Sequence, residues 1–341
     1  ALDDTEGGET SRSNLLINHV KKLDDNQRLK SNAYISKYDF LLYSNFTFFL
    51  ESLNGDRPNG FNDQIRQSES RTIIGADTDY QYSFDIEEHD VQFKLNAGLG
   101  FRYDDVNDVE LARSQNRRET LDRLSFGDVD ELNGFAYAKA TIKKNKWTFN
   151  PGVRLDYFKF GYDNFLTPTF ENRTEDEVLV SPKLNIIHST SKNLQLFAKA
   201  GFGFHSNDTR VFFDPNSPVT KALPSAFGFD LGTIYKPIDK LVINAALWSL
   251  NSEQEFVYVG DGGVVEPSGE SQRYGIDFGA RYQFNKWLYG NFDINYTVAR
   301  SVDEPDGSDF IPLAPDLTST GGLSVKNLGK FSGNINYRLI D

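Results

Sequence analysis

The chain has 341 residues, a formal net charge of −13 and no cysteine, yet 14% of its residues are aromatic. The negative charge argues against nucleic-acid binding, which needs clustered Lys and Arg. Without cysteine, neither a disulfide framework nor a thiolate metal site is possible. Mean hydropathy is −0.50, and no stretch approaches the ~18 consecutive apolar residues of a membrane-spanning helix.

A polar segment opens the chain at 1–11, and alternating segments follow to its end. Over 91–103, apolar residues occupy every second position, with polar residues or glycine between them. The same pattern returns at 274–284 and 331–339. Strands of soluble sandwiches usually run about 5–6 residues, whereas these patterns continue for about 10–14. The alternation therefore predicts strands that present one face to lipid and the other to water or polar protein.

About fourteen such strands are expected in chain order. They lie near 12–22, 31–50, 69–84, 90–105, 130–143, 146–161, 178–190, 193–205, 226–236, 240–258, 271–284, 286–300, 317–326 and 330–340.

The connections between these strands alternate in length. Short connections lie at 86–89, 143–146, 190–193, 237–240, 285–286 and 327–330. Long connections lie at 51–68, 106–129, 162–177, 206–225, 259–270 and 301–316. Outer-membrane barrels have short periplasmic turns and long extracellular loops. The sequence therefore predicts an all-β fold, a transmembrane antiparallel up-and-down β-barrel that crosses the Gram-negative outer membrane many times, with 1–341 as one barrel domain.

Aromatic residues gather near the strand ends, as the girdles at the two lipid–water boundaries do. Ordinary strand propensity is the alternative explanation. The residues are Tyr38, Tyr43, Phe46, Phe48, Phe49, Trp147, Phe149, Tyr157, Phe158, Phe160, Tyr282, Phe284 and Trp287.

Several stretches resemble one family, the TonB-dependent outer-membrane receptors. The stretch 38–50, followed by Asn54-Gly55-Asp56, resembles a family strand and the loop that it enters. Ser181-Pro182-Lys183-Leu184 and the stretch 201–210 resemble a family hairpin. The stretches 256–263, 266–268 and 273–277 resemble the loop and strand that follow. The resemblance extends from about residue 5 to the end of the chain.

The resemblance implies a 22-stranded, plugged barrel, in which these segments are strands six to nineteen. The N-terminal plug with its TonB box, five earlier strands and three later strands would lie outside the chain. The implied function is import of a scarce nutrient, with a ferric siderophore or other iron chelate as the leading ligand. The implied partners are the TonB–ExbB–ExbD complex, a small-molecule ligand and outer-membrane lipid. A passive channel for small hydrophobic or anionic solutes, and an accessory barrel that anchors a partner, are the alternatives.

The first group of candidate site residues lies where an up-running strand enters the loop 206–225. Continued alternation points His205 into the lumen at the extracellular rim, beside Asn207, Asp208 and Arg210. These residues would contact ligand or plug, or hydrogen-bond to neighbouring loops. A metal site on His205 and Asp208 has less support, because no third ligand stands at a recognisable spacing. Phe212 and Phe213 in this loop would either stack on a ligand or pack within the loop.

The second group lies on the lumen face of the wall, where Asp230, Asp277, Arg273 and Arg281 are expected to contact the plug. The resemblance implies that acidic residues here face plug arginines, and a charge buried beneath a plug needs such a partner. Lumen water, or ion pairs with Arg273, Arg281 or Arg338 across strands, would satisfy the carboxylates instead.

Glycines on the same face remove side-chain bulk, which would let a plug or another strand approach closely. They are Gly201, Gly203, Gly275 and Gly279.

Two acidic stretches, 104–110 and 303–309, are expected to be solvated loops, since neither has the spacing of a calcium-binding loop. Catalysis is not expected. Adjacent residues in His205-Ser206-Asn207 point to opposite faces, whereas a triad must converge. The sequence contains no phosphate loop, dinucleotide fingerprint or zinc motif, so no enzyme activity, cofactor or metal is predicted.

Overall fold

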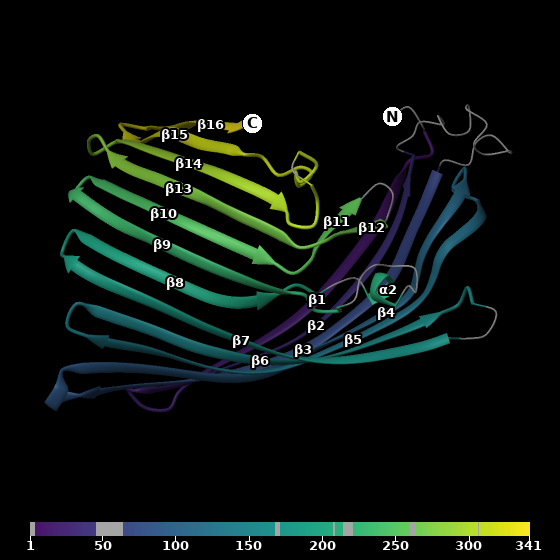
Figure 1. Cartoon of the computed structure of the whole chain (residues 1–341), viewed down its shortest axis with the longest axis horizontal. Helices are drawn as coiled ribbons and strands as arrows, with labels where there is room; N and C mark the ends of the chain where they lie inside the picture. Colours follow the sequence, from purple (N-terminus) through teal and green to yellow (C-terminus); the bar gives the residue numbers. More distant parts are fainter. Residues whose placement is uncertain are drawn as a thin grey trace.

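The computed structural model describes residues 4–45, 64–167, 171–206, 209–213, 221–259, 264–305 and 307–341. Fourteen antiparallel strands form one sheet, in which each strand pairs with its neighbour in the chain except where β10 pairs with β13 (Figure 1). Two further strands of the described residues, β11 and β12, form a separate hairpin. The predicted fold and number of sheet strands are thus confirmed. Among the described residues, no helix is long and apolar enough to cross a membrane.

The bounds are β1 Gly7–Lys22, β2 Gln27–Ser44, β3 Gln64–Ile86, η1 Glu87–His89, β4 Val91–Gln115, β5 Glu119–Lys144, β6 Trp147–Asn164, β7 Glu171–Ser191, β8 Leu194–Phe204, α2 Thr209–Phe212, β9 Ser225–Ile238, β10 Leu241–Ser252, β11 Glu255–Val259, β12 Val264–Ser268, β13 Ser271–Gln283, β14 Leu288–Ser301, β15 Leu317–Leu328 and β16 Phe331–Ile340.

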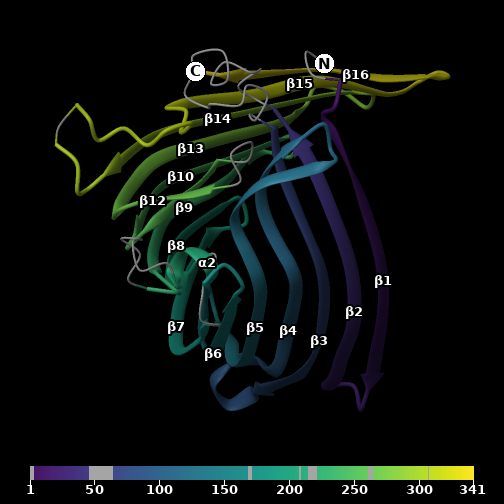
Figure 2. The same cartoon turned by 90° about the vertical axis from the view of Figure 1, so that its right-hand side faces the viewer.

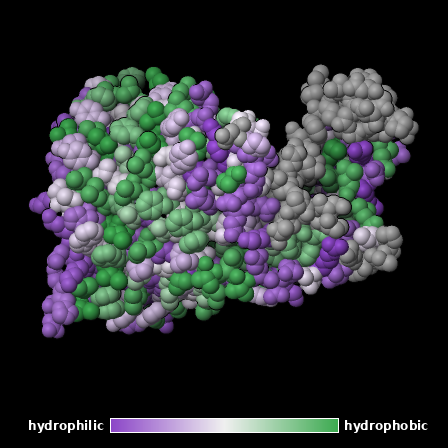
Figure 3. Space-filling view, in the orientation of Figure 1, coloured by the Kyte–Doolittle hydropathy of each residue, from purple (hydrophilic) through white to green (hydrophobic). Residues whose placement is uncertain are grey.

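The sheet curves into a deep trough whose edge strands, β1 and β16, do not pair with each other (Figure 2). The short turns lie together at one end, on the left in Figure 1, and the longer connections lie at the other. Figure 3 shows hydrophobic residues spread over the strands, with hydrophilic residues at the turn end and also toward the loop end. This loop asymmetry identifies the turn end as periplasmic.

Alternation decides which face each side chain takes. On the outer face of β4, Leu99 is 66% exposed and Phe101 is 43% exposed. On the inner face, the Asn32 amide donates to Asp77 at 2.8 Å, and the Tyr137 hydroxyl donates to Asp79 at 2.8 Å. The convex face is therefore suited to hydrocarbon and the concave face to water or polar protein.

The stretch 106–129, predicted to be a long loop, is instead the outer half of the β4–β5 hairpin, which turns at 116–118. The register shifts between Val106 and Val109, and Asp108 has a positive φ of 53°. This bulge adds a residue and breaks the alternation that marks a strand in sequence. The predicted loops 51–68 and 162–177 were also too long, since β3 begins at Gln64 and β6 and β7 leave only 165–170 between them. The predicted strand 240–258 was too long as well, because β10 ends at Ser252 and the connection to β13 contains the β11–β12 hairpin.

The segment after β8 enters the hollow of the trough as the short helix α2 (Figures 1 and 2). Phe212 and Phe213 pack against a cluster centred on Phe160 and Leu223, each of which is 1% exposed. Phe213 also packs against Val106, Val109, Val129 and Tyr162. Burial of these aromatic side chains holds the segment inside the trough. Packing is thus the role that the structure gives Phe212 and Phe213.

The aromatic residues predicted to form girdles divide between the two faces of the sheet. Trp147 is 45% exposed and Phe284 is 47% exposed. Phe158 and Phe160 instead face inward, where they stack on each other beneath α2. Phe46, Phe48 and Phe49 lie outside the described residues.

Candidate functional site

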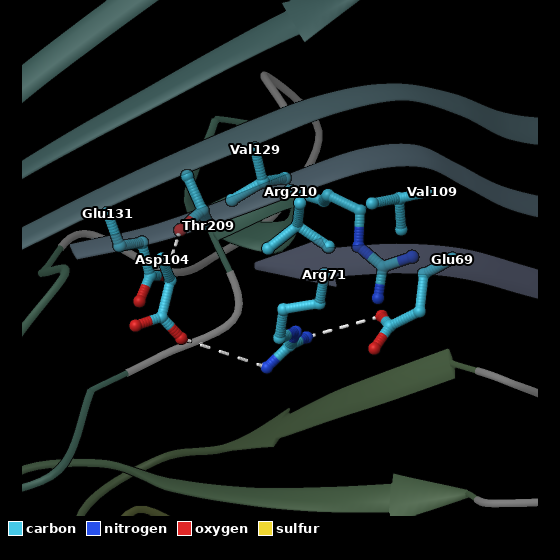
Figure 4. Close-up of a pocket in the computed structure, with 9 residues that line it drawn as sticks. Glu69, Arg71, Asp104, Val109, Val129, Glu131, Thr209 and Arg210 are labelled. Carbon is cyan, nitrogen blue, oxygen red and sulfur yellow. Dashed lines mark hydrogen bonds and ion pairs between the residues drawn. The ribbon is translucent and has the colours of Figure 1, made fainter. Parts of the chain in front are cut away.

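A polar cavity of about 130 Å³ lies at the extracellular end of the trough, between α2 and strands β3, β4 and β5. A second cavity of about 220 Å³ adjoins it and shares Glu69, Val109 and Arg210. The first cavity is lined by Glu69, Arg71, Asp104, Val106, Val109, Val129, Glu131, Thr209 and Arg210. Charged side chains of both signs thus surround a small valine-walled space (Figure 4).

The charges of the wall come from side chains that alternate inward along β3 and β4. Arg102 donates two hydrogen bonds to Asp104, from Nε at 2.6 Å and from Nη2 at 2.7 Å. Arg71 donates from Nη2 to Glu69 at 3.2 Å, while its Nη1 lies 4.0 Å from Asp104. The 4.0 Å separation is too long for a direct hydrogen bond. Arg71 therefore retains donor capacity toward the cavity.

The helix α2 supplies the opposite side of the cavity. Thr209 is 3% exposed, and its hydroxyl donates to Glu131 at 2.5 Å. Figure 4 shows Arg210 on the same side of the cavity as Glu69, with Arg71 between Glu69 and Asp104. Two guanidinium groups and three carboxylates thus converge from β3, β4, β5 and the loop after β8. This arrangement can bind an oxygen-rich polar ligand through charge-assisted hydrogen bonds.

Nearer the middle of the wall, Asp277 is the centre of a second polar group. Its carboxylate accepts hydrogen bonds from the Trp248 indole, at 3.0 Å, and from the Asn295 amide. These donors are neutral, and no Lys or Arg among the described residues forms an ion pair with Asp277. A cavity of about 310 Å³ opens beside it, lined also by Asn244, Asp293 and Thr320.

The family of the chain follows from a comparison with known proteins. The family model described as "TonB dependent receptor-like, beta-barrel" matches residues 2–340. The chain belongs to the TonB-dependent receptor family. It is accordingly a multi-pass barrel of the Gram-negative outer membrane, and the predicted resemblance and location are confirmed.

Solved receptor barrels have the same fold. The unliganded ferric citrate transporter FecA superposes with a TM-score of 0.76 at 15% identity, covering 97% of this chain and 49% of that one. The copper transporter OprC gives 0.75 at 18% identity, covering 98% and 53%. The siderophore receptor PiuA from Acinetobacter baumannii gives 0.73 at 14% identity, covering 99% and 55%. The chain spans about half the length of each of these receptors.

Of the rim residues predicted from sequence, the TonB-dependent receptor barrel places Arg210 in the cavity. His205 follows β8 at the same end, where its backbone amide donates to the Pro224 carbonyl at 3.2 Å. Asn207 and Asp208 lie outside the described residues. Their ligand or plug contacts remain predictions.

The lumen residues of the receptor barrel form pairs that sequence did not anticipate. Asp230 lies 3.8 Å from Lys199, and Arg281 forms a two-pronged ion pair with Asp293 at 2.8 and 2.9 Å. Asp230 thus has a lysine as its cationic neighbour across strands, and Arg281 pairs with Asp293 instead of with Asp230 or Asp277. Arg273 stands opposite Leu250 and Ala299 in the sheet register.

At two of the four lumen glycines, a neighbouring strand approaches closely, which is one of the two alternatives expected from sequence. A Cβ on Gly275 would lie 2.6 Å from the Trp248 ring, and one on Gly279 would lie 2.7 Å from the Asn244 side chain. Their space is filled by neighbouring strands of the receptor barrel itself. A Cβ on Gly201 would meet Lys183 at 3.1 Å, whereas Gly203 has nothing within 4 Å.

The acidic stretch 104–110 is not a solvated loop, and that prediction was wrong. Asp104 is 5% exposed and Glu110 is 4% exposed, and Glu110 forms ion pairs with Arg66 and with Arg123, the latter at 2.7 Å. Buried carboxylates require such partners. In the stretch 303–309, Asp309 pairs with Arg300 at 3.3 Å.

Outside the membrane-spanning strands, Glu253, just after β10, forms hydrogen bonds with the segment that leads into β9. Its carboxylate accepts hydrogen bonds from Lys221 Nζ and from the Ser225 amide, both at 2.9 Å. The Lys221 ammonium, followed by the Ser225 amide, lowers the pKa of the Glu253 carboxyl below its ordinary value. These hydrogen bonds hold the end of the connection between β8 and β9, which contains α2, against the end of β10.

Sequence reasoning missed Glu69, Arg71, Asp104, Glu131 and Thr209. Glu69, Arg71 and Asp104 share one side of two predicted strands, so alternation placed them on the polar face. Nothing in the sequence indicated that the loop after β8 turns inward to meet them.

Proposed function

We propose that this chain forms part of the wall of a receptor that imports a scarce nutrient in a TonB-dependent manner, with an iron chelate as the ligand. The observation that carries the proposal is the cavity between α2 and β3–β5. Arg71 and Arg210 present guanidinium groups beside carboxylates there, at the extracellular end. Guanidinium forks match the oxygen atoms of citrate, hydroxamate or catecholate groups.

The open trough supports a larger barrel around the same lumen. In hydrocarbon, each unpaired backbone group at the β1 and β16 edges would cost several kcal/mol. Further strands would remove this cost by closing the barrel. A plug would then occupy the hollow, and TonB–ExbB–ExbD would act on the plug.

In this arrangement, Asp230, Asp277, Arg273 and Arg281 line the surface that contacts the plug. Asp277 supports this role best, because its partners in the wall are the neutral side chains of Trp248 and Asn295. A cationic plug residue would neutralise the carboxylate. His205, Asn207 and Asp208 would contact the plug or the ligand at the rim.

A growth assay tests the function. A strain that lacks the receptor gene is grown on a panel of iron chelates, vitamins, metals and glycans, with and without TonB. The proposal expects one iron chelate to support growth only when receptor and TonB are both present. Uptake that persists without TonB, together with conductance of the purified full-length protein in planar bilayers, would indicate a passive channel instead.

The cavity is tested by Arg71→Gln in the full-length receptor. Loss of charge-assisted hydrogen bonds costs about 1.5–3 kcal/mol, so the dissociation constant of the chelate should rise about 10- to 100-fold. Lys37→Gln is the matched control, because Lys37 is exposed and stands beside Tyr38 on the neighbouring strand. Equal affinities of both variants would exclude the cavity as the binding site without contradicting uptake.

A further inference from the structure

Lysine residues gather at the periplasmic turns of this acidic chain. Five successive turns, from β5–β6 to β15–β16, contain nine lysines and one aspartate, and every one of these lysines is exposed. The turns lie at 143–146, 190–194, 236–240, 284–288 and 326–330. We call the nine lysines the lysine belt. The whole chain has a net charge of −13, so the belt is a positively charged region on a negatively charged protein.

Two turns of the belt share a motif that joins the cation to an indole. Asn145-Lys146-Trp147 and Asn285-Lys286-Trp287 stand in the β5–β6 and β13–β14 turns. Trp147 is 45% exposed and Trp287 is 36% exposed. Tryptophan is enriched at the boundary between hydrocarbon and headgroups. The motif therefore places lysine side chains at headgroup depth.

The β5–β6 turn also shows that part of the belt faces lipid. Lys144 pairs with Trp147 in the sheet register, so the two side chains share one face. Along β6, the same alternation brings Val153 and Leu155, 46% and 47% exposed, to that face. Trp147 packs against Phe149 at 6.0 Å and against His188 at 4.3 Å between ring centroids. Lys144 thus stands at the periplasmic border of the lipid-facing surface.

We propose that the lysine belt is a binding site for anionic phospholipid headgroups of the periplasmic leaflet, with phosphatidylglycerol as the occupant. Each lysine near an anionic membrane surface attracts it by about 1 kcal/mol. The chain as a whole is acidic, so an attraction to anionic lipid depends on where the lysines stand. The inference rests on the outer-membrane location and is independent of the transported ligand.

The remaining periplasmic turns supply a natural comparison. In the β1–β2 turn, Lys22 pairs with Asp25 at 2.5 Å, and Asp24 accompanies them. The β3–β4 turn carries Glu87 and Glu88. Anionic lipid should therefore prefer the belt to these two turns.

The test is native mass spectrometry of the full-length receptor with equal amounts of phosphatidylglycerol and phosphatidylcholine of identical acyl chains. Wild type should retain phosphatidylglycerol preferentially. Lys144→Gln with Lys286→Gln should lower the ratio of bound phosphatidylglycerol to phosphatidylcholine about fivefold or more. Lys144→Arg with Lys286→Arg should keep the ratio, because both charges remain.

The matched control is Lys21→Gln with Lys22→Gln, which removes the same charge from the β1–β2 turn. This pair should leave the ratio unchanged. Equal binding of both lipids to wild type, an unchanged ratio in the Lys144/Lys286 glutamine variant, or an equal fall in the control would overturn the proposal. Heat-dependent electrophoretic mobility verifies that each variant is folded.

Discussion

Replacing Arg154 by alanine would isolate the energetic role of a buried charge on the inner wall. Arg154 donates to both oxygens of Asp156, from Nε and from Nη2, each at 2.7 Å. Asp156 is 0% exposed, and its remaining donor is the neutral Asn133 amide at 3.1 Å. Arg154 also lies 4.0 Å from the centre of the Phe135 ring. The variant therefore leaves a buried carboxylate with one neutral partner.

Breaking such a pair costs about 3–5 kcal/mol, and the lost contact with the ring adds about 0.5–1 kcal/mol. The free energy of unfolding should therefore fall by about 3.5–6 kcal/mol. Guanidinium chloride titration of the receptor in phospholipid vesicles, followed by tryptophan fluorescence, measures this change. Adding Asp156→Asn to the alanine variant should recover part of the loss, because it removes the uncompensated charge.

The control is Lys22→Ala, which removes an ion pair whose side chains are 66% and 93% exposed. Exposed pairs contribute about 0–1 kcal/mol. The reasoning would be refuted if Arg154→Ala lowered the free energy of unfolding no more than Lys22→Ala does. It would also be refuted if adding Asp156→Asn lowered the free energy of unfolding further.

Three further outcomes are expected. Because the pKa of Glu253 is lowered by folding, its carboxylate stabilises the fold above about pH 4.5, and this stabilisation is lost as the pH falls through the lowered pKa. Hydrogen exchange at the nearby loop amides should therefore become faster as the pH falls through the lowered pKa. Glu253→Gln should abolish this pH dependence of exchange. A Cβ on Gly98 would lie 2.6 Å from the Tyr137 ring, so Gly98→Ala should destabilise the barrel by about 1–3 kcal/mol in the same titration, whereas Gly134→Ala, with nothing within 4 Å, should not. Asp277→Asn should weaken retention of the plug in the full-length receptor, measured as increased conductance in planar bilayers; unchanged conductance would contradict plug contact at this position.

How far the sequence predicts the fold depends on how regular each strand is. Where β4 alternates without interruption from 91 to 103, the strand and the face that each side chain takes follow directly from the residues. Beyond the bulge at Val106–Val109 the alternation fails, and a strand was mistaken for a loop. A bulge shifts the faces of all later residues by one position. Local patterns cannot reveal such a shift unless the partner strand is known.

At the candidate site too, the sequence predicts local features but not contacts between distant segments. Sequence placed Arg210 at the rim, since a strand end and a long loop are local features. It did not bring Arg210 to Glu69, which stands 141 positions earlier in the numbering. That meeting depends on burial of Phe213 against the extended β4–β5 hairpin, a contact between distant segments.

The sequence by itself determined that this is an antiparallel membrane barrel wall, because lipid imposes a two-residue period and a membrane-bound hairpin needs short turns on one side. It also determined the lysine content of the periplasmic turns. Tertiary structure alone decided that the loop after β8 turns inward, that the acidic stretch at 104–110 is buried against arginines, and that Asp277 is held by Trp248 and Asn295. These outcomes depend on which side chains meet across strands and loops, and such meetings are set by packing and register rather than by local pattern.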